Sequence, residues 1–159
     1  VINMSWGSED SSDFLAEAIA QGLDAQILMV AAVGNEPTGQ PVYPAALPGV
    51  IGIAATGPDG GFWPESNSGE FVDLAAPGQA ALPVGYGGPP GEYAGTSIAS
   101  VFVARTLALY LSQNPQATPE SAWTRLQSSL SPLPAGASTN RWGAGILDQA
   151  AVDRFLAAP

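Results

Sequence analysis

The 159 residues include no histidine and no cysteine, two residue types that are common in catalytic and metal-binding sites. The lack of cysteine excludes disulfide bonds, thiol catalysis and thiolate metal sites, and the lack of histidine removes the commonest other ligand of transition metals. A bound metal would therefore be a hard cation on oxygen ligands. The missing histidine also removes the usual base that activates a serine nucleophile.

Positive charge and long apolar runs are also scarce. Four arginines face 14 acidic residues, which gives a formal net charge of -10. Such a chain repels phosphate backbones, so the charge excludes nucleic acid as a partner. The longest uninterrupted apolar runs, residues 27–33 and 107–111, fall well short of the ~18 residues that a membrane-spanning helix needs. The sequence predicts no membrane segment.

The remaining pattern alternates strands with helices. We predict strands over residues 1–4, 26–33, 50–55 and 71–75, and helices over residues 97–111, 118–130 and 148–156. Another helix is predicted to start after a cap within residues 8–12 and to end near residue 23. Two of the strands are apolar without alternation, which is typical of parallel strands that are covered on both faces. The pattern predicts an α/β fold, an open and mostly parallel sheet with flanking helices, in a single domain over residues 1–159.

A candidate nucleophile, Ser97, stands at the entrance to the most apolar predicted helix. That position would expose its hydroxyl and bring its backbone N–H close to the positive end of the helix dipole. Asn35 follows the buried strand over residues 26–33, where its side-chain N–H could reach the same developing oxyanion. The glycines Gly34 and Gly95 allow close approach of a substrate backbone. Taken alone, however, a serine at a helix start is usually a cap, and an asparagine before Glu-Pro is usually a turn residue.

Six short segments raise the catalytic interpretation above these alternatives. They are residues 1–7 (Val-Ile-Asn-Met-Ser-Trp-Gly), 31–36 (Ala-Ala-Val-Gly-Asn-Glu), 43–45 (Tyr-Pro-Ala), 73–78 (Asp-Leu-Ala-Ala-Pro-Gly), 95–100 (Gly-Thr-Ser-Ile-Ala-Ser) and 143–148 (Gly-Ala-Gly-Ile-Leu-Asp). In this order they resemble the subtilisin-like serine proteases, or subtilases. The resemblance covers nearly the whole chain but only the C-terminal part of a catalytic domain, so we expect a subtilisin-like sheet that lacks its N-terminal strands.

The resemblance implies a role for each matching residue. Ser97 would be the nucleophile of a serine endopeptidase and Asn35 the oxyanion donor, with a polypeptide as substrate. The residues expected to bind substrate are Ser5, Trp6, Gly7, Ala32, Val33, Gly34, Gly95 and Thr96. We expect no cofactor, although the resemblance allows calcium near Asp73, for which we favour a structural role. It also implies a secreted or extracytoplasmic protein.

The chain departs from the family pattern in two places. Residues 100–105 read Ser-Val-Phe-Val-Ala-Arg where many subtilases have Ser-Pro-His-Val-Ala-Gly, which marks a divergent member. The aspartate and histidine of the family's triad precede its serine, and this chain has no histidine. We therefore expect the isolated chain to be inactive and the complete protein to be a serine endopeptidase.

The first residues support the same interpretation. A strand that begins at residue 1, without a leader pattern, indicates a truncated or processed chain. Its edge, with Val1 and Met4 at the two ends, would be apolar and open. We expect the missing Asp/His portion, or a second copy of the chain, to pair there.

Two alternatives remain open. The chain could be a catalytically inactive module of the same fold that holds a peptide as an added strand. It could also resemble the sedolisins, which use glutamate as base and would make the missing histidine natural. Those proteases have aspartate as the oxyanion residue, so Asn35 argues against them.

Overall fold

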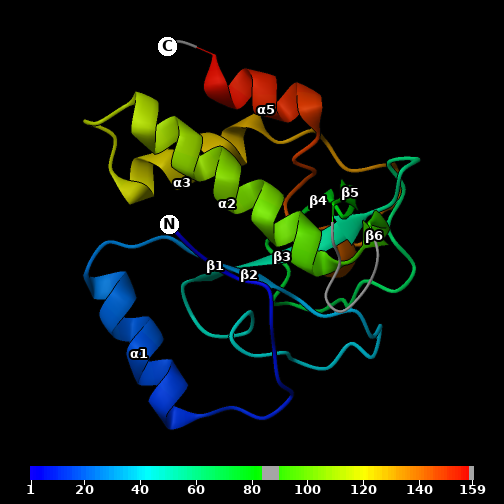
Figure 1. Ribbon diagram of the computed structural model, residues 1–159, viewed down its shortest axis with the longest axis horizontal. Coiled ribbons are helices and arrows are strands. Elements are labelled where there is room, and N and C mark those ends of the chain that lie inside the picture. Colours follow the sequence, from blue (N-terminus) through cyan, green and yellow to red (C-terminus); the bar gives the residue numbers. More distant parts are fainter. Residues whose placement is uncertain (84–89, 158–159) are drawn as a thin grey trace.

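The computed structural model describes residues 1–83 and 90–157, and its centre is a parallel sheet in the order β1-β2-β3-β4 (Figure 1). The strands are β1 (Ile2–Met4), β2 (Met29–Ala32), β3 (Val50–Thr56) and β4 (Leu74–Pro77). Every residue of β2 and β3 is buried, as the apolar runs without alternation predict. Within the described ranges β1 pairs on one side only, with β2, so it forms an edge of this sheet.

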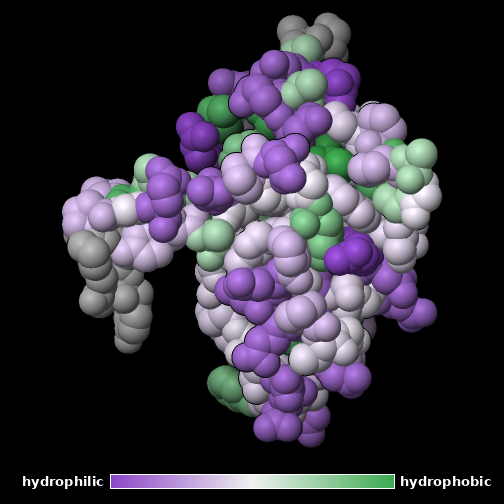
Figure 2. All heavy atoms as spheres, turned by 90° about the vertical axis from the view of Figure 1, so that its right-hand side faces the viewer, coloured by the Kyte–Doolittle hydropathy of each residue, from purple (hydrophilic) through white to green (hydrophobic). Residues whose placement is uncertain are grey.

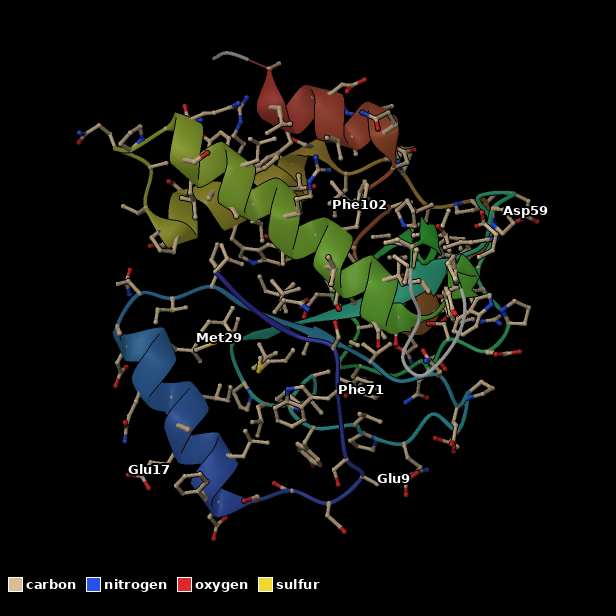
Figure 3. All side chains as sticks on the ribbon, viewed as in Figure 1. Glu9, Glu17, Met29, Asp59, Phe71 and Phe102 are labelled. Atoms are coloured by element: carbon tan, nitrogen blue, oxygen red, sulfur yellow. The ribbon has the colours of Figure 1, made fainter. Side chains whose placement is uncertain are left out.

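Helices cover both faces of the sheet. One face carries α2 (Thr96–Gln113), α3 (Pro119–Ser129) and α5 (Gln149–Leu156), whose buried residues form a single apolar cluster with alternate strand residues such as Val30. The other strand residues, such as Met29, join a second cluster with α1 (Asp13–Asp24) and with Trp142 of α4 (Thr139–Trp142). Figure 3 shows Met29 in the layer between the sheet and α1.

The central helix α2 is apolar on nearly all sides, which is typical of a buried helix. Ala99, Val103 and Leu107 are fully buried against the sheet. The helix starts after Gly95, which gives no side-chain cap, and ends at Asn114, directly before a proline. The prediction of a central helix is confirmed, with one more residue at its start and two more at its end.

The other helix starts follow the chemistry that their sequences predict. Ser12 caps α1 by accepting a hydrogen bond from Leu15 N, and Asp148 caps α5 in the same way from Ala151 N. Thr118 and Ser121 form a reciprocal capping box at the start of α3. No helix in the part of the chain that the structure describes is long and apolar enough to cross a membrane.

The structure corrects the prediction in three places. The strand predicted over residues 71–75 is β4 (Leu74–Pro77), because residues 69–72 form a turn in which Val72 N donates to Gly69 O. An antiparallel hairpin of β5 (Gln79–Leu82) and β6 (Gly91–Ala94) was not predicted, and neither was the short α4. Figure 1 places this hairpin at the right, and Figure 2, which views the molecule from that side, shows a narrow arm that stands away from the left of the body.

Candidate active site

Three chain segments meet at one end of the sheet. Ser5 follows β1 directly, Gly34 and Asn35 follow β2, and Ser97 lies in the first turn of α2. Since β1 and β2 are parallel neighbours, their carboxyl ends lie side by side, which is where open α/β sheets hold ligands. The first turn of α2 lies at the same place, and among its backbone N–H groups that of Ser97 has no acceptor in the described residues.

Thr96 fixes the orientation of the Asn35 side chain. The side-chain oxygen Oδ1 of Asn35 accepts hydrogen bonds from Thr96 N at 2.9 Å and from Thr96 Oγ1 at 2.8 Å. Thr96 Oγ1 accepts in turn from Gly34 N at 3.2 Å. The two contacts identify the oxygen of the Asn35 amide, so the nitrogen Nδ2 is the group that remains available to a ligand.

The available amide nitrogen lies over Gly95, directly before the candidate nucleophile. A Cβ atom at Gly95 would lie 3.1 Å from Asn35 Nδ2, so a side chain there would crowd the amide. Gly95 also has φ 155°, a value that L side chains rarely adopt. Neither Asn35 Nδ2 nor the backbone N–H of Ser97 has an acceptor among the described residues. Asn35 and Ser97 therefore each keep one N–H donor that no described residue uses.

The hydroxyl of Ser97 is bonded to the chain itself. Ser97 Oγ donates to the backbone oxygen of Ser5 at 3.2 Å, and Ser5 Oγ donates to Ser97 O at 2.9 Å. A carbonyl oxygen is too weak a base to take the serine proton, and the chain has no histidine. The candidate nucleophile and the candidate oxyanion donors therefore have no histidine beside them in this chain.

A cleft of about 320 Å³ lies in front of this group. Its lining includes both Asn35 and Ser97, and it contains six of the eight residues that were predicted to bind substrate: Ser5, Trp6, Gly7, Ala32, Gly34 and Thr96. Sequence reasoning missed five further lining residues: Ser8, Glu9, Glu36, Thr38 and Val42. Figure 3 places Glu9 on the segment between β1 and α1.

The two other predicted substrate residues do not line the cleft. The side chain of Val33 is fully buried in the core, because residues 32 and 33 point to opposite faces of the extended chain. The side chain of Val33 therefore belongs to the core and not to the cleft lining, and its contact with substrate stays a prediction. Gly95 is buried beneath the Asn35 amide and acts through that residue rather than on the cleft surface.

Val42 occupies the space between two glycines of the cleft. A Cβ atom at Gly7 would collide with Cγ1 of Val42, and one at Gly34 would approach Cγ2 to 3.3 Å. The isopropyl group thus fills the space that both glycines leave open and narrows the cleft. No local pattern marks Val42, since its neighbours in the cleft come from two distant segments.

Asp73 is held by the sheet. Its Oδ2 accepts a hydrogen bond from Gly52 N at 2.7 Å. Burial raises the pKa of the Asp73 carboxyl above its ordinary value, and the bond from Gly52 opposes the rise. Within residues 1–83 and 90–157 no three acidic side chains cluster as a metal site would require. Calcium binding stays a prediction.

Phe102 is the residue that stands where many subtilases carry a non-catalytic histidine. It is half-buried and packs against the apolar cluster on the α2 side of the sheet, and Figure 3 shows it on α2. An aromatic side chain extends this core without touching the cleft.

Comparisons with known proteins agree with this geometry. The model of the subtilase family matches residues 1–145. Subtilisin from Bacillus pumilus is 34% identical over 155 residues, which are 93% of this chain and 54% of that protein. Subtilisin E from Bacillus subtilis (strain 168) is 36% identical over 136 residues, 81% of this chain and 35% of that protein.

A solved structure shows the same fold. The prenylagaramide maturation protease PagA superposes with a TM-score of 0.82 at 26% identity, over 97% of this chain and 61% of that one. The chain therefore spans about half the length of the relatives that it matches. The match of the family model over residues 1–145, together with the parallel sheet, shows that this chain belongs to the subtilase family.

Proposed function

We propose that this chain supplies the nucleophile and the oxyanion donors of a serine endopeptidase, and that an aspartate and a histidine come from another portion of the complete protein. The observation that carries the proposal is the Asn35 amide, whose oxygen is held by Thr96 and whose nitrogen lies over Gly95. A turn residue without function would not need its amide nitrogen aimed at a helix N-terminus beside a serine.

The proposed reaction is acyl transfer to Ser97. Ser97 Oγ attacks the carbonyl carbon of the substrate while its proton passes to the histidine, and the carbonyl electron pair moves onto the oxygen. Asn35 Nδ2 and Ser97 N–H donate to that oxyanion. The intermediate collapses when the histidine gives its proton to the departing amine, which leaves an acyl-enzyme on Ser97. A water molecule, activated by the same histidine, then releases the acid and restores the serine.

The substrate of the proposed enzyme is a polypeptide with a small uncharged side chain before the cleaved bond. Two small uncharged residues, Ala32 and Gly34, lie in the lining of the cleft. Val42 reduces the space between Gly7 and Gly34, which disfavours large side chains at that position.

The Asp/His portion is proposed to cover the edge of β1 and the adjoining face of α2. Ile2 of β1 is 42% exposed, and on α2 Val101 is 49% and Leu109 37% exposed. Parallel sheets are normally covered on both faces, and an open apolar strand edge invites pairing. The longer chains of the matched relatives support a covering segment in the complete protein.

An extracytoplasmic location is part of the proposal. The acidic composition without cysteine is compatible with it, and one relative is named the minor extracellular protease Epr of Bacillus subtilis. Another is named an intracellular serine protease of Paenibacillus polymyxa, so the family alone does not decide. Fractionation of the source cells, with an antibody against this chain, tests the location.

Labelling with a fluorophosphonate tests the proposed function. We expect the complete protein to be labelled at Ser97, the Ser97→Ala variant not to be labelled, and the isolated chain to react no faster than free serine. Labelling of the complete protein at another residue contradicts the assignment. Peptide binding by a complete protein that is never labelled favours the inactive binding module.

A further inference from the structure

Asn3, in the middle of β1, is joined to the nucleophile although it does not line the cleft. Its side-chain nitrogen Nδ2 donates to Ser5 Oγ at 2.8 Å. Residues 3 and 5 lie on the same face of an extended chain, so the asparagine and the serine stand together against the start of α2.

Ser5 connects Asn3 to Ser97 by two contacts. Ser5 Oγ donates to the backbone oxygen of Ser97 at 2.9 Å, and the backbone oxygen of Ser5 accepts from Ser97 Oγ at 3.2 Å. Ser100 Oγ lies 3.1 Å from Ser5 Oγ and 3.0 Å from Ser97 O, so it closes the group. The rotamer of Ser5 and the position of the first turn of α2 therefore depend on each other.

The orientation of the Asn3 amide follows from the proton count. Ser5 Oγ has one proton, and the 2.9 Å contact with Ser97 O, which is an acceptor only, requires it. Ser5 Oγ must then accept from Asn3, which places the amide nitrogen toward Ser5. The amide oxygen of Asn3 is buried and has no hydrogen-bond partner among the described residues.

An unpaired buried oxygen lowers stability, because it has lost its hydration without compensation. A leucine, which has the same branching and the same number of side-chain heavy atoms, would avoid that cost. An asparagine at this position is thus a poor choice for stability alone, and its only side-chain hydrogen bond within the described chain is to the serine that contacts Ser97.

We propose that Asn3 is a positioning residue for Ser97, which acts by fixing the hydroxyl of Ser5 against the first turn of α2. This inference rests on the proposed function. In catalysis the Ser97 hydroxyl must leave the carbonyl of Ser5 and turn toward a base, while its backbone N–H keeps its place in the oxyanion site. The chain of bonds from Asn3 through Ser5 to Ser97 O holds the backbone during that rotation.

The substitution Asn3→Leu in the complete peptidase tests the proposal. We expect kcat to fall about tenfold, the effect of one positioning hydrogen bond on the barrier. KM should stay unchanged, because Asn3 does not line the cleft. The midpoint of thermal unfolding is measured on the same variant and reports a structural role separately. A purely structural role would instead lower the midpoint and leave kcat unchanged.

Asn114→Leu is the matched control. Asn114 is also half-buried, and its Nδ2 donates one hydrogen bond, to Tyr110 O at 2.9 Å, but at the far end of α2. We expect this variant to lose stability and to keep its kcat. An unchanged kcat in Asn3→Leu overturns the inference, whatever happens to its stability.

A double-mutant cycle with Ser5→Ala covers the case in which stability and kcat fall together. If Asn3 acts through Ser5, the double variant should lose no more kcat than Ser5→Ala alone. Losses that multiply overturn the inference. Should Asn3→Leu fail to fold, Ser5→Ala carries the test, and a normal kcat in that variant overturns it. Activity that survives Ser97→Ala would instead refute the proposed function itself.

Discussion

The side-chain oxygen of Asn35 accepts two hydrogen bonds from Thr96, from the backbone nitrogen at 2.9 Å and from the hydroxyl at 2.8 Å. Thr96 thereby decides which end of the amide faces the cleft. Its hydroxyl also accepts from Gly34 N, so a single side chain connects the segment after β2 to the start of α2.

Replacement of this hydroxyl should therefore impair catalysis more than binding. We expect Thr96→Val in the complete peptidase to lower kcat about tenfold, because one hydrogen bond that holds the oxyanion donor is lost and Gly34 N is left unpaired. KM should change little. Thr96→Ser keeps the hydroxyl and should keep most of the activity. Equal kcat values for the valine and serine variants would contradict the role of the Thr96 hydroxyl.

Substrate preference should depend on Val42. Val42→Gly removes the isopropyl group between Gly7 and Gly34 and opens the cleft. We expect kcat/KM for substrates with a large apolar residue before the cleaved bond to rise at least about tenfold relative to alanine substrates, since each methylene in such a pocket is worth about 10- to 200-fold. Peptides that differ only at this residue provide the measurement. Thr38→Ser removes a methyl group elsewhere in the cleft and serves as control, and an equal shift there would contradict the role of Val42.

Stability should depend on the ionisation of Asp73. The raised pKa means that the folded state binds the Asp73 proton more tightly than the unfolded state does. The contribution of this group to stability is therefore greatest below the unfolded pKa and falls as the pH rises through the folded pKa. We expect Asp73→Asn, which keeps an acceptor for Gly52 N, to match the parent protein at low pH and to be the more stable protein at neutral pH. Urea unfolding of both proteins across this pH range measures the difference. A gain that is independent of pH would show that the carboxyl ionisation is not its cause.

Much of the fold could be predicted, because a long apolar run is stable in water only where both of its faces are buried. A run such as residues 27–33 has no polar face, so its strand must be covered on both sides, and the two apolar clusters confirm this. The strand after residue 71 was misplaced because Phe71 and Val72 look like strand residues, whereas Gly69 closes a turn with Val72. The β5–β6 hairpin has short strands with little apolar alternation and gave no signal.

The site, like the fold, has residues that the sequence predicts and residues that it does not. That Ser97 and Asn35 line one cleft could be predicted, because a resemblance in ordered segments carries their positions. Val42 and the bond from Asn3 to Ser5 could not, since a close approach between distant segments has no pattern in the sequence. Val33 was assigned to the cleft because its neighbours belong there, although alternate residues of an extended chain point to opposite faces.

The last prediction concerns the face of α2 that the Asp/His portion is proposed to cover. Two exposed apolar residues, one on each face of the sheet, serve as the test position and its control. Val101 on α2 is 49% exposed and Phe14 on α1 is 84% exposed. Arg105 lies one turn beyond Val101, so a glutamate at residue 101 would gain a favourable partner if the surface were open to water. If the Asp/His portion covers this face, the same glutamate loses its hydration.

We therefore expect Val101→Glu to lower the free energy of unfolding of the complete protein by about 1–3 kcal/mol, and Phe14→Glu to change it by less than about 0.5 kcal/mol. Chemical denaturation of the two variants measures this difference, and equal stabilities would mean that the α2 face stays exposed and that the Asp/His portion docks elsewhere.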